Sequence, residues 1–189
     1  MFNRVKRPAA RIARRGQQLC LACGLCCNGA IFAEVRLQAG DRPLPLARLA
    51  ATVASKPLCT ARSPRQYLQP CLFFDGRRCR IYPDRPRYCR EFDCLLLKSL
   101  RAGTTTWPDA CRTVRRARRH LDKVRRLLRR LGDRDETLAL GKRFRRIARR
   151  LQQAPPDAAT ARTYGELTLA FHNLNCLLSQ AFYPGALKG

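Results

Sequence analysis

Four cysteines fall within eight residues near the start of the chain, and no other feature constrains its folding more. They are Cys20, Cys23, Cys26 and Cys27, in the stretch CLACGLCC. A reduced thiolate is a strong ligand for zinc or iron, and the C-x2-C spacing lets two sulfurs from one tight turn reach the same ion. In a helix all four would lie within an arc of roughly 120°. Because crowded thiolates repel one another and oxidise, the cluster predicts a metal anchor that is completed by ligands elsewhere in the chain.

A second group of four cysteines, separated from the first by 43 residues, can supply those ligands. Its members are Cys71, Cys79, Cys89 and Cys94. The stretch 70–82 reads PCLFFDGRRCRIY, in which two apolar segments flank Asp-Gly, a strong signal for a β-hairpin. A three-residue loop would place Cys71 opposite Cys79, close enough to share one ion, whereas a two-residue loop would place them on opposite faces.

The segment after this hairpin is predicted to be a helix, with Asp84 as its N-cap, Pro86 in its first turn and Gly103 at its end. In a continuous helix Cys89 and Cys94 would lie about 140° apart and would not easily bind one ion. Either the helix begins after Cys89, or the two thiols belong to different parts of a larger site.

The cellular compartment decides how the eleven cysteines are interpreted. No apolar run has the length of a signal-peptide core or approaches the roughly 18 residues of a membrane-spanning helix, so we expect a cytoplasmic protein. A reducing cytosol disfavours disulfides, and the number of cysteines is odd, so metal ligation is favoured over a disulfide framework. Cys59, Cys111 and Cys176 lie outside both groups and are expected to be spare. His120 and His172 have no second ligand at metal spacing.

The expected fold class is mainly α: a small metal-nucleated, cysteine-rich domain with a short β-hairpin, plus a C-terminal three-helix, arginine-rich extension. We expect residues 1–18 to form a flexible basic arm, 19–103 the metal-binding domain and 104–189 the helical extension.

Hydrophobic periodicity supports these divisions. Apolar residues recur every three or four positions in 114–131, 140–151 and 164–181, which predicts three amphipathic helices. Trp107 is expected to pack at the junction of the two halves. In the cysteine-rich part, residues 30–37 alternate like a short extended strand, and 46–53 have the spacing of a short helix.

The motifs CxxCGxCC, PC and CRIYPDRPRYCREFDC together resemble the CxxCxxCC, or YkgJ-like, cysteine-cluster family, described as zinc- or iron-chelating proteins. The resemblance covers roughly residues 20–97, two fifths of the chain. It implies a cytosolic bacterial metal-binding protein that uses these eight cysteines. Some relatives are called iron-sulfur oxidoreductases, and longer ones include flagellin lysine methylases, so the resemblance also implies an enzyme as an alternative.

Eight thiolates are compatible with two zinc ions, with one four-iron cluster plus four spare thiols, or with a two-metal centre that has bridging sulfur. The C-x2-C-x2-C run favours iron, but the x3-C-Pro completion of bacterial ferredoxins is missing. A radical-enzyme C-x3-C-x2-C motif, a Gly-rich dinucleotide turn and a P-loop are missing too, and no catalytic residue or substrate is indicated.

Arginines crowd the second cysteine group, namely Arg80, Arg85, Arg87 and Arg90. Their charges would neutralise a negative thiolate centre and their N–H groups would donate to sulfur. A solvated basic face explains any one of them equally well.

The formal net charge is +26, and 33 of the 39 basic residues are arginine. Such a charge favours polyanions, meaning nucleic acid, an anionic membrane surface or an acidic protein. The arginines of 115–119, 125–126 and 129–130 predict electrostatic, sequence-independent nucleic-acid binding as a further alternative, because the tail has few aromatic residues for base stacking. An arginine-rich coding composition would produce the same bias without selection for binding.

Overall fold

The computed structural model describes residues 6–41 and 66–183. This part of the chain contains helices α1 (Lys6–Cys23), α2 (Arg87–Glu91), α3 (Leu95–Ala102), α4 (Trp107–Arg130), α5 (Leu140–Gln153) and α6 (Ala158–Ala181), and strands β1 (Glu34–Arg36) and β2 (Gln66–Leu68). The protein is thus mainly helical with one small antiparallel sheet, as its sequence predicts. No helix of the described segments is both long enough and apolar enough to cross a membrane.

The three C-terminal helices bury their apolar stripes, and α4 and α6 are also capped at their N-terminal ends. The Thr106 hydroxyl accepts a hydrogen bond from the Asp109 N–H at the start of α4, and the Asp157 carboxylate accepts one from the Thr160 N–H at the start of α6. Gly132, with φ of 82°, follows the end of α4 and provides the left-handed turn there. The predicted helical tail is therefore confirmed.

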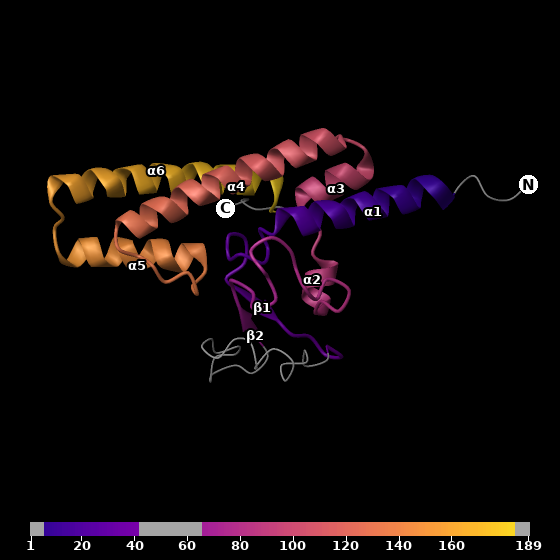
Figure 1. Cartoon of the computed structure of the whole chain (residues 1–189), viewed down its shortest axis with the longest axis horizontal. Helices are drawn as coiled ribbons and strands as arrows, with labels where there is room; N and C mark the ends of the chain where they lie inside the picture. Colours follow the sequence, from indigo (N-terminus) through magenta and orange to yellow (C-terminus); the bar gives the residue numbers. More distant parts are fainter. Residues whose placement is uncertain (1–5, 42–65, 184–189) are drawn as a thin grey trace, which may run out of the picture.

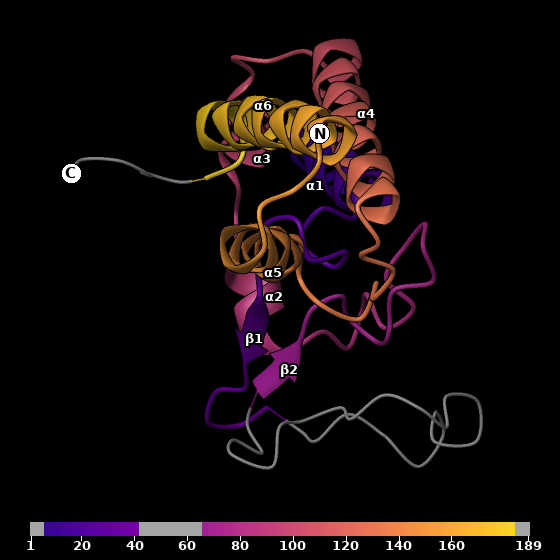
Figure 2. The ribbon, with the colours of Figure 1, turned by 90° about the vertical axis from the view of Figure 1, so that its left-hand side faces the viewer.

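Helices α4 and α6 lie side by side, and α5 lies along one side of this pair (Figures 1 and 2). Their shared core continues into the cysteine-rich part of the chain. It includes Leu19 of α1, Leu25 after it, Leu100 of α3, Leu121 of α4 and Leu174 of α6, none more than 7% exposed. One hydrophobic core therefore crosses the boundary expected between residues 103 and 104. Trp107 packs against this core, as expected for a residue at the junction.

The N-terminal segment differs from the expected flexible arm, because α1 begins at Lys6 and runs to Cys23. Its last turns are held by tertiary packing that local composition does not reveal. Leu19 is 2% exposed, and a Cβ on Gly16 would stand 3.0 Å from the Leu97 side chain of α3. Helices α1 and α3 therefore approach closely.

The two strands lie elsewhere than the predicted hairpin at 70–82. Strand β1 falls within the expected extended stretch 30–37 and pairs with β2, with Val35 opposite Tyr67. A small second core of Val35, Tyr67 and Phe73 lies beneath this sheet. The helix expected at 46–53 lies outside the described residues.

A buried ionic network fixes α5 against the turn that precedes it. Asp133 is 1% exposed at its side chain, and its two carboxylate oxygens accept from Arg143 Nε at 3.0 Å and Arg146 Nη2 at 2.7 Å. The Arg143 side chain is only 2% exposed. Removing the carboxylate would therefore leave a buried guanidinium without its counter-charge.

We expect Asp133→Asn to lower the free energy of unfolding by about 3–5 kcal/mol, since one member of a buried pair is lost. Urea denaturation measures the change. Glu166→Gln is the control, because Glu166 and its partner Arg130 are both more than half exposed and the pair contributes at most about 1 kcal/mol. Equal effects of the two substitutions would contradict this role of Asp133.

Candidate metal centre

The first cysteine group spans the end of a helix and the turn after it. Cys20 and Cys23 belong to the last turn of α1, while Cys26 and Cys27 follow Gly24 in a turn closed by the Cys27 N–H donating to the Gly24 carbonyl at 3.0 Å. Gly24 has φ of 66°, and a Cβ there would stand 2.7 Å from the Phe74 ring. A glycine is therefore required where the helix ends.

The Asp-Gly turn of the second group is wider than a three-residue loop. The Asp75 carboxylate accepts from the N–H groups of Arg77 and Arg78, at 2.9 and 2.8 Å, and this sets a four-residue turn. The residue opposite Cys79 is consequently Phe74 and not Cys71, so the turn matches neither the three-residue nor the two-residue loop considered from the sequence.

A direct backbone link joins the two cysteine groups. The Cys71 N–H donates to the Cys27 carbonyl at 2.7 Å. This hydrogen bond connects residues 44 positions apart in the printed sequence and brings the turn after α1 against the start of the second group.

The helix predicted through Cys89 and Cys94 is broken between them. Helix α2 has Pro86 as its N-cap, not Asp84, and it ends at Glu91, where Phe92 takes an extended conformation. Cys94 then caps α3, and its Sγ accepts from the Leu97 N–H at 3.4 Å. The break removes the fixed angle between the two thiols that a continuous helix would impose.

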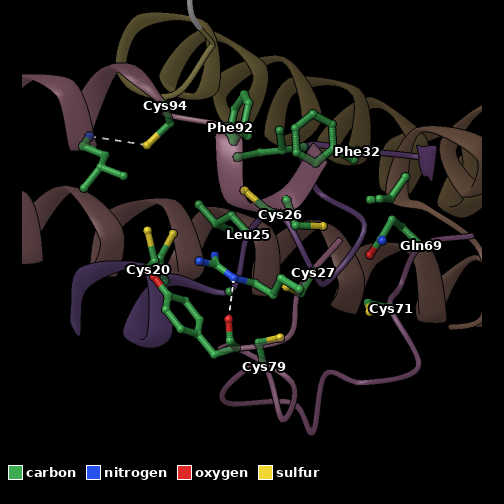
Figure 3. Close-up of a pocket in the computed structure, with 18 of the residues that line it drawn as sticks. Cys20, Leu25, Cys26, Cys27, Phe32, Gln69, Cys71, Cys79, Phe92 and Cys94 are labelled. Carbon is green, nitrogen blue, oxygen red and sulfur yellow. Dashed lines mark hydrogen bonds between the residues drawn. The ribbon is translucent and has the colours of Figure 1, made fainter. Parts of the chain in front are cut away.

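All eight clustered cysteines line one cavity of about 90 Å³ (Figure 3). The remaining lining is mainly apolar and includes Leu25, Phe32 and Phe73. Cys111 and Cys176 do not line it, and the Cys176 thiol is exposed, 3.4 Å from His172 Nε2. Neither His120 nor His172 lines it. Cys59 lies outside the described residues.

The charge effects among the eight thiols are largest within two groups of four, although Cys89 also acts on Cys26 and Cys26 on Cys27. Burial raises the pKa of Cys23 to about 12, and charge on Cys94 and Cys20 adds to the increase. Burial also raises the pKa of Cys26 well above its usual value. After burial, the largest causes of this increase are the charges on Cys23, Cys94 and Cys20. We call Cys20, Cys23, Cys26 and Cys94 the first thiol set.

The other four thiols affect one another in the same way. The Cys27 thiol donates a hydrogen bond to Cys79, which raises the pKa of Cys27 and lowers that of Cys79. Burial followed by charge on Cys71 raises the pKa of Cys89 to about 12. We call Cys27, Cys71, Cys79 and Cys89 the second thiol set; Cys26 and Cys27 join the two sets in the sequence.

The raised pKa values have a chemical consequence. Most of these thiols are neutral near pH 7 in the absence of a cation, because burial penalises the thiolate. A bound metal ion would supply the missing positive charge and displace the protons.

The positive charge of Arg85 acts on thiols of both sets. It lines the cavity, its guanidinium lies 3.6 Å from the centre of the Tyr82 ring, and its Nε donates to the Tyr82 carbonyl at 2.9 Å. Burial raises the pKa of Cys20, and the positive charge of Arg85 opposes this increase. The same charge opposes the increase in the pKa of Cys89. Arg80, Arg87 and Arg90 do not line the cavity.

The donor set fits a thiophilic metal, because eight sulfurs face one largely apolar cavity. Within the described segments, however, no three cysteine, histidine, aspartate or glutamate side chains are already arranged to hold an ion. Coordination therefore requires the thiols to rotate inward from the conformations seen here.

Two cavity residues, Val114 of α4 and Phe182 after α6, come from the helical tail. The sequence did not distinguish them from ordinary core residues, because both simply continue apolar stripes. Their position means that the tail closes part of the cavity.

A family model described as "CxxCxxCC: Putative zinc- or iron-chelating domain" matches residues 19–124. The match includes all eight clustered cysteines and most of α4, and it covers more than half of the chain. Neither the curated proteins nor the solved structures gave a match.

Proposed function

This chain belongs to the CxxCxxCC family of zinc- or iron-chelating domains, and we propose that it binds two metal ions, one in each thiol set. The observation that carries the proposal is that all eight clustered cysteines line one cavity. The charge effects among the thiols, which are largest within each set, support a division into two sites. Four thiolates are the usual complement of a structural zinc site and of many iron sites.

Each bound ion would supply a positive charge that keeps its four sulfurs deprotonated. Two divalent ions with eight thiolates leave an excess negative charge, which the guanidinium of Arg85 at the cavity is placed to reduce. The Tyr82 hydroxyl hydrogen-bonds to Cys20 and orients that sulfur. The apolar lining limits water at the thiols and so slows proton uptake and oxidation.

Metal analysis tests this function directly. Protein purified without oxygen, and loaded with zinc or iron if necessary, should contain about two ions per chain in an elemental analysis, one for each four-thiolate site. A colourless zinc protein favours a structural role, whereas brown protein that reductant bleaches favours an iron-sulfur redox role or the oxidoreductase alternative. A chain that holds no tightly bound zinc or iron would contradict the proposal.

A second function, electrostatic contact with polyanions, is supported by one face of α5. Lys142, Arg145, Arg146, Arg149 and Arg150 line a groove of about 480 Å³ there, together with Gln153. Their spacing of three or four residues keeps these cations on neighbouring positions of one helix. Arg146 is already paired with Asp133 and Asp135, so the other cations of this row are the ones that match the negative charges along a nucleic-acid backbone.

We predict that this face binds DNA and RNA with steep salt dependence and without base preference. In Arg145→Glu/Arg149→Glu, loss of two phosphate contacts should reduce the slope of log affinity against log salt by about 2. Fluorescence anisotropy across a salt series measures the slope. The control, Arg77→Glu/Arg162→Glu, has the same net charge and alters exposed arginines on other elements. Equal slopes for both variants, or a sequence preference at high salt, would contradict the prediction.

A further inference from the structure

One polar atom at the thiol cavity is buried without a partner. Gln69 follows β2, is 3% exposed and lines the cavity together with the eight cysteines. Its side-chain carbonyl oxygen, Oε1, accepts no hydrogen bond from the described part of the chain. Buried acceptors are nearly always satisfied, so this atom requires an explanation.

The backbone holds Gln69 at this place independently of its side chain. The Gln69 N–H donates to the Ala33 carbonyl at 3.0 Å, which extends the pairing of β1 with β2. A leucine or methionine would fill a similar volume among the apolar lining residues and would leave no acceptor unpaired. In the fold described here, an amide whose oxygen has no partner is therefore less stable than an apolar side chain would be.

The neighbours of Gln69 indicate what its oxygen faces. Cys71, a member of the second thiol set, is two residues further along the chain, and Figure 3 shows Gln69 on the same side of the cavity as Cys71 and away from Cys20. Thiols are weak hydrogen-bond donors, and they lose their protons when they bind a metal. A cation held by these sulfurs would remain as the partner of the oxygen.

We propose that Gln69 Oε1 is an additional ligand, donating a lone pair to the cation held by Cys27, Cys71, Cys79 and Cys89. This inference rests on the proposed metal-binding function. An amide oxygen is neutral, so it adds a donor without adding to the negative charge of four thiolates. Zinc is usually four-coordinate, but it takes a fifth ligand during the reaction in some catalytic sites. The second thiol set would then provide four sulfurs and one oxygen, whereas the first provides four sulfurs only.

The test uses Gln69→Leu in the full chain, with zinc alone as the ligand. The metal-free variant should melt at the same temperature as the metal-free parent, because Gln69 lies in the segment whose folding depends on the metal. Its affinity for one of the two zinc ions should fall by about 10- to 100-fold in a chelator competition, the range seen when groups around a metal are removed. The affinity for the other ion should not change.

Cobalt substitution gives a second readout. Replacing zinc by Co²⁺ should produce one spectrum with the intense visible bands of four sulfur ligands in a tetrahedron, and a second with weaker bands from five donors. Gln69→Leu should convert the second spectrum to the first type. Gln69→Glu, which keeps an oxygen at this position, should retain the five-donor spectrum.

The outcomes separate this inference from the function on which it rests. If the parent protein binds zinc and Gln69→Leu binds both ions with unchanged affinity and spectrum, Gln69 is not a ligand although the metal function stands. If the parent binds no zinc, both fail. Gln69→Met is a second variant, which controls for a folding defect that is specific to leucine. If both metal-free variants lose helicity, the amide has a structural role and the inference is overturned.

Discussion

Complete removal of metal is expected to unfold the segment that carries the thiols while α4 and α6 stay helical. The part of the cysteine-bearing segment between α1 and α3 has little regular structure to hold it, since its sheet has two strands of three residues and α2 has only five. Its separate core consists of Val35, Tyr67 and Phe73. A structural zinc ion contributes roughly 10 to 16 kcal/mol in small domains, far more than such a core supplies.

Circular dichroism and thermal melting before and after chelation under reducing conditions measure this effect. Most helical signal should persist, because α4 and α6 have a long shared core. The melting temperature should fall, since Leu19 and Leu25 of the cysteine-bearing segment are part of that core. Added zinc should restore the original melt. Unchanged circular dichroism and melting after complete chelation would show that the metal is not structural.

Structural features that depend on local sequence pattern could be predicted from the sequence. The helices at α4, α5 and α6 follow from apolar residues spaced three or four apart and from stops such as Gly132. Membership of the cysteine family followed from the motifs alone, and the family model bears it out.

The sequence did not predict what depends on contacts between distant residues. The alternation over residues 30–37 indicated the stretch that contains β1, but its partner β2 has only three residues, too few for a periodicity to be visible. Helix α2 ends without a glycine or proline, where Phe92 leaves the helix and packs edge-on against Phe32, with ring centroids 4.7 Å apart. The Asp75 carboxylate accepts hydrogen bonds from two backbone N–H groups. The turn that results gives the segment a register different from the one expected from the sequence.

The grouping of the thiols shows the same limit. Local spacing places Cys27 with Cys20, Cys23 and Cys26, since all four lie within eight residues. In the fold, the hydrogen bond between Cys71 N–H and the Cys27 carbonyl brings Cys27 to the second thiol set. Each set therefore combines cysteines from both sequence groups.

Replacing one whole thiol set is expected to remove one metal ion and leave the other. A variant with serine at all four positions of the second set should bind one ion per chain, because serine cannot replace a thiolate and the first set keeps its four sulfurs. The second-set positions are Cys27, Cys71, Cys79 and Cys89. Elemental analysis of the anaerobically purified protein measures the loss.

The matched control is Cys111→Ser/Cys176→Ser, because neither thiol lines the cavity. This variant should keep the full metal content. If it loses as much metal as the second-set variant, general destabilisation rather than loss of ligands accounts for the effect.

The most direct test is the metal content of a variant with serine at Cys20, Cys23, Cys26 and Cys27. These four residues lie within eight positions of the sequence but are divided three to one between the thiol sets. If the sets are as described, the variant damages both sites, and elemental analysis should find almost no tightly bound metal. One full ion per chain would contradict the account, because Cys71, Cys79, Cys89 and Cys94 would then form a complete site by themselves.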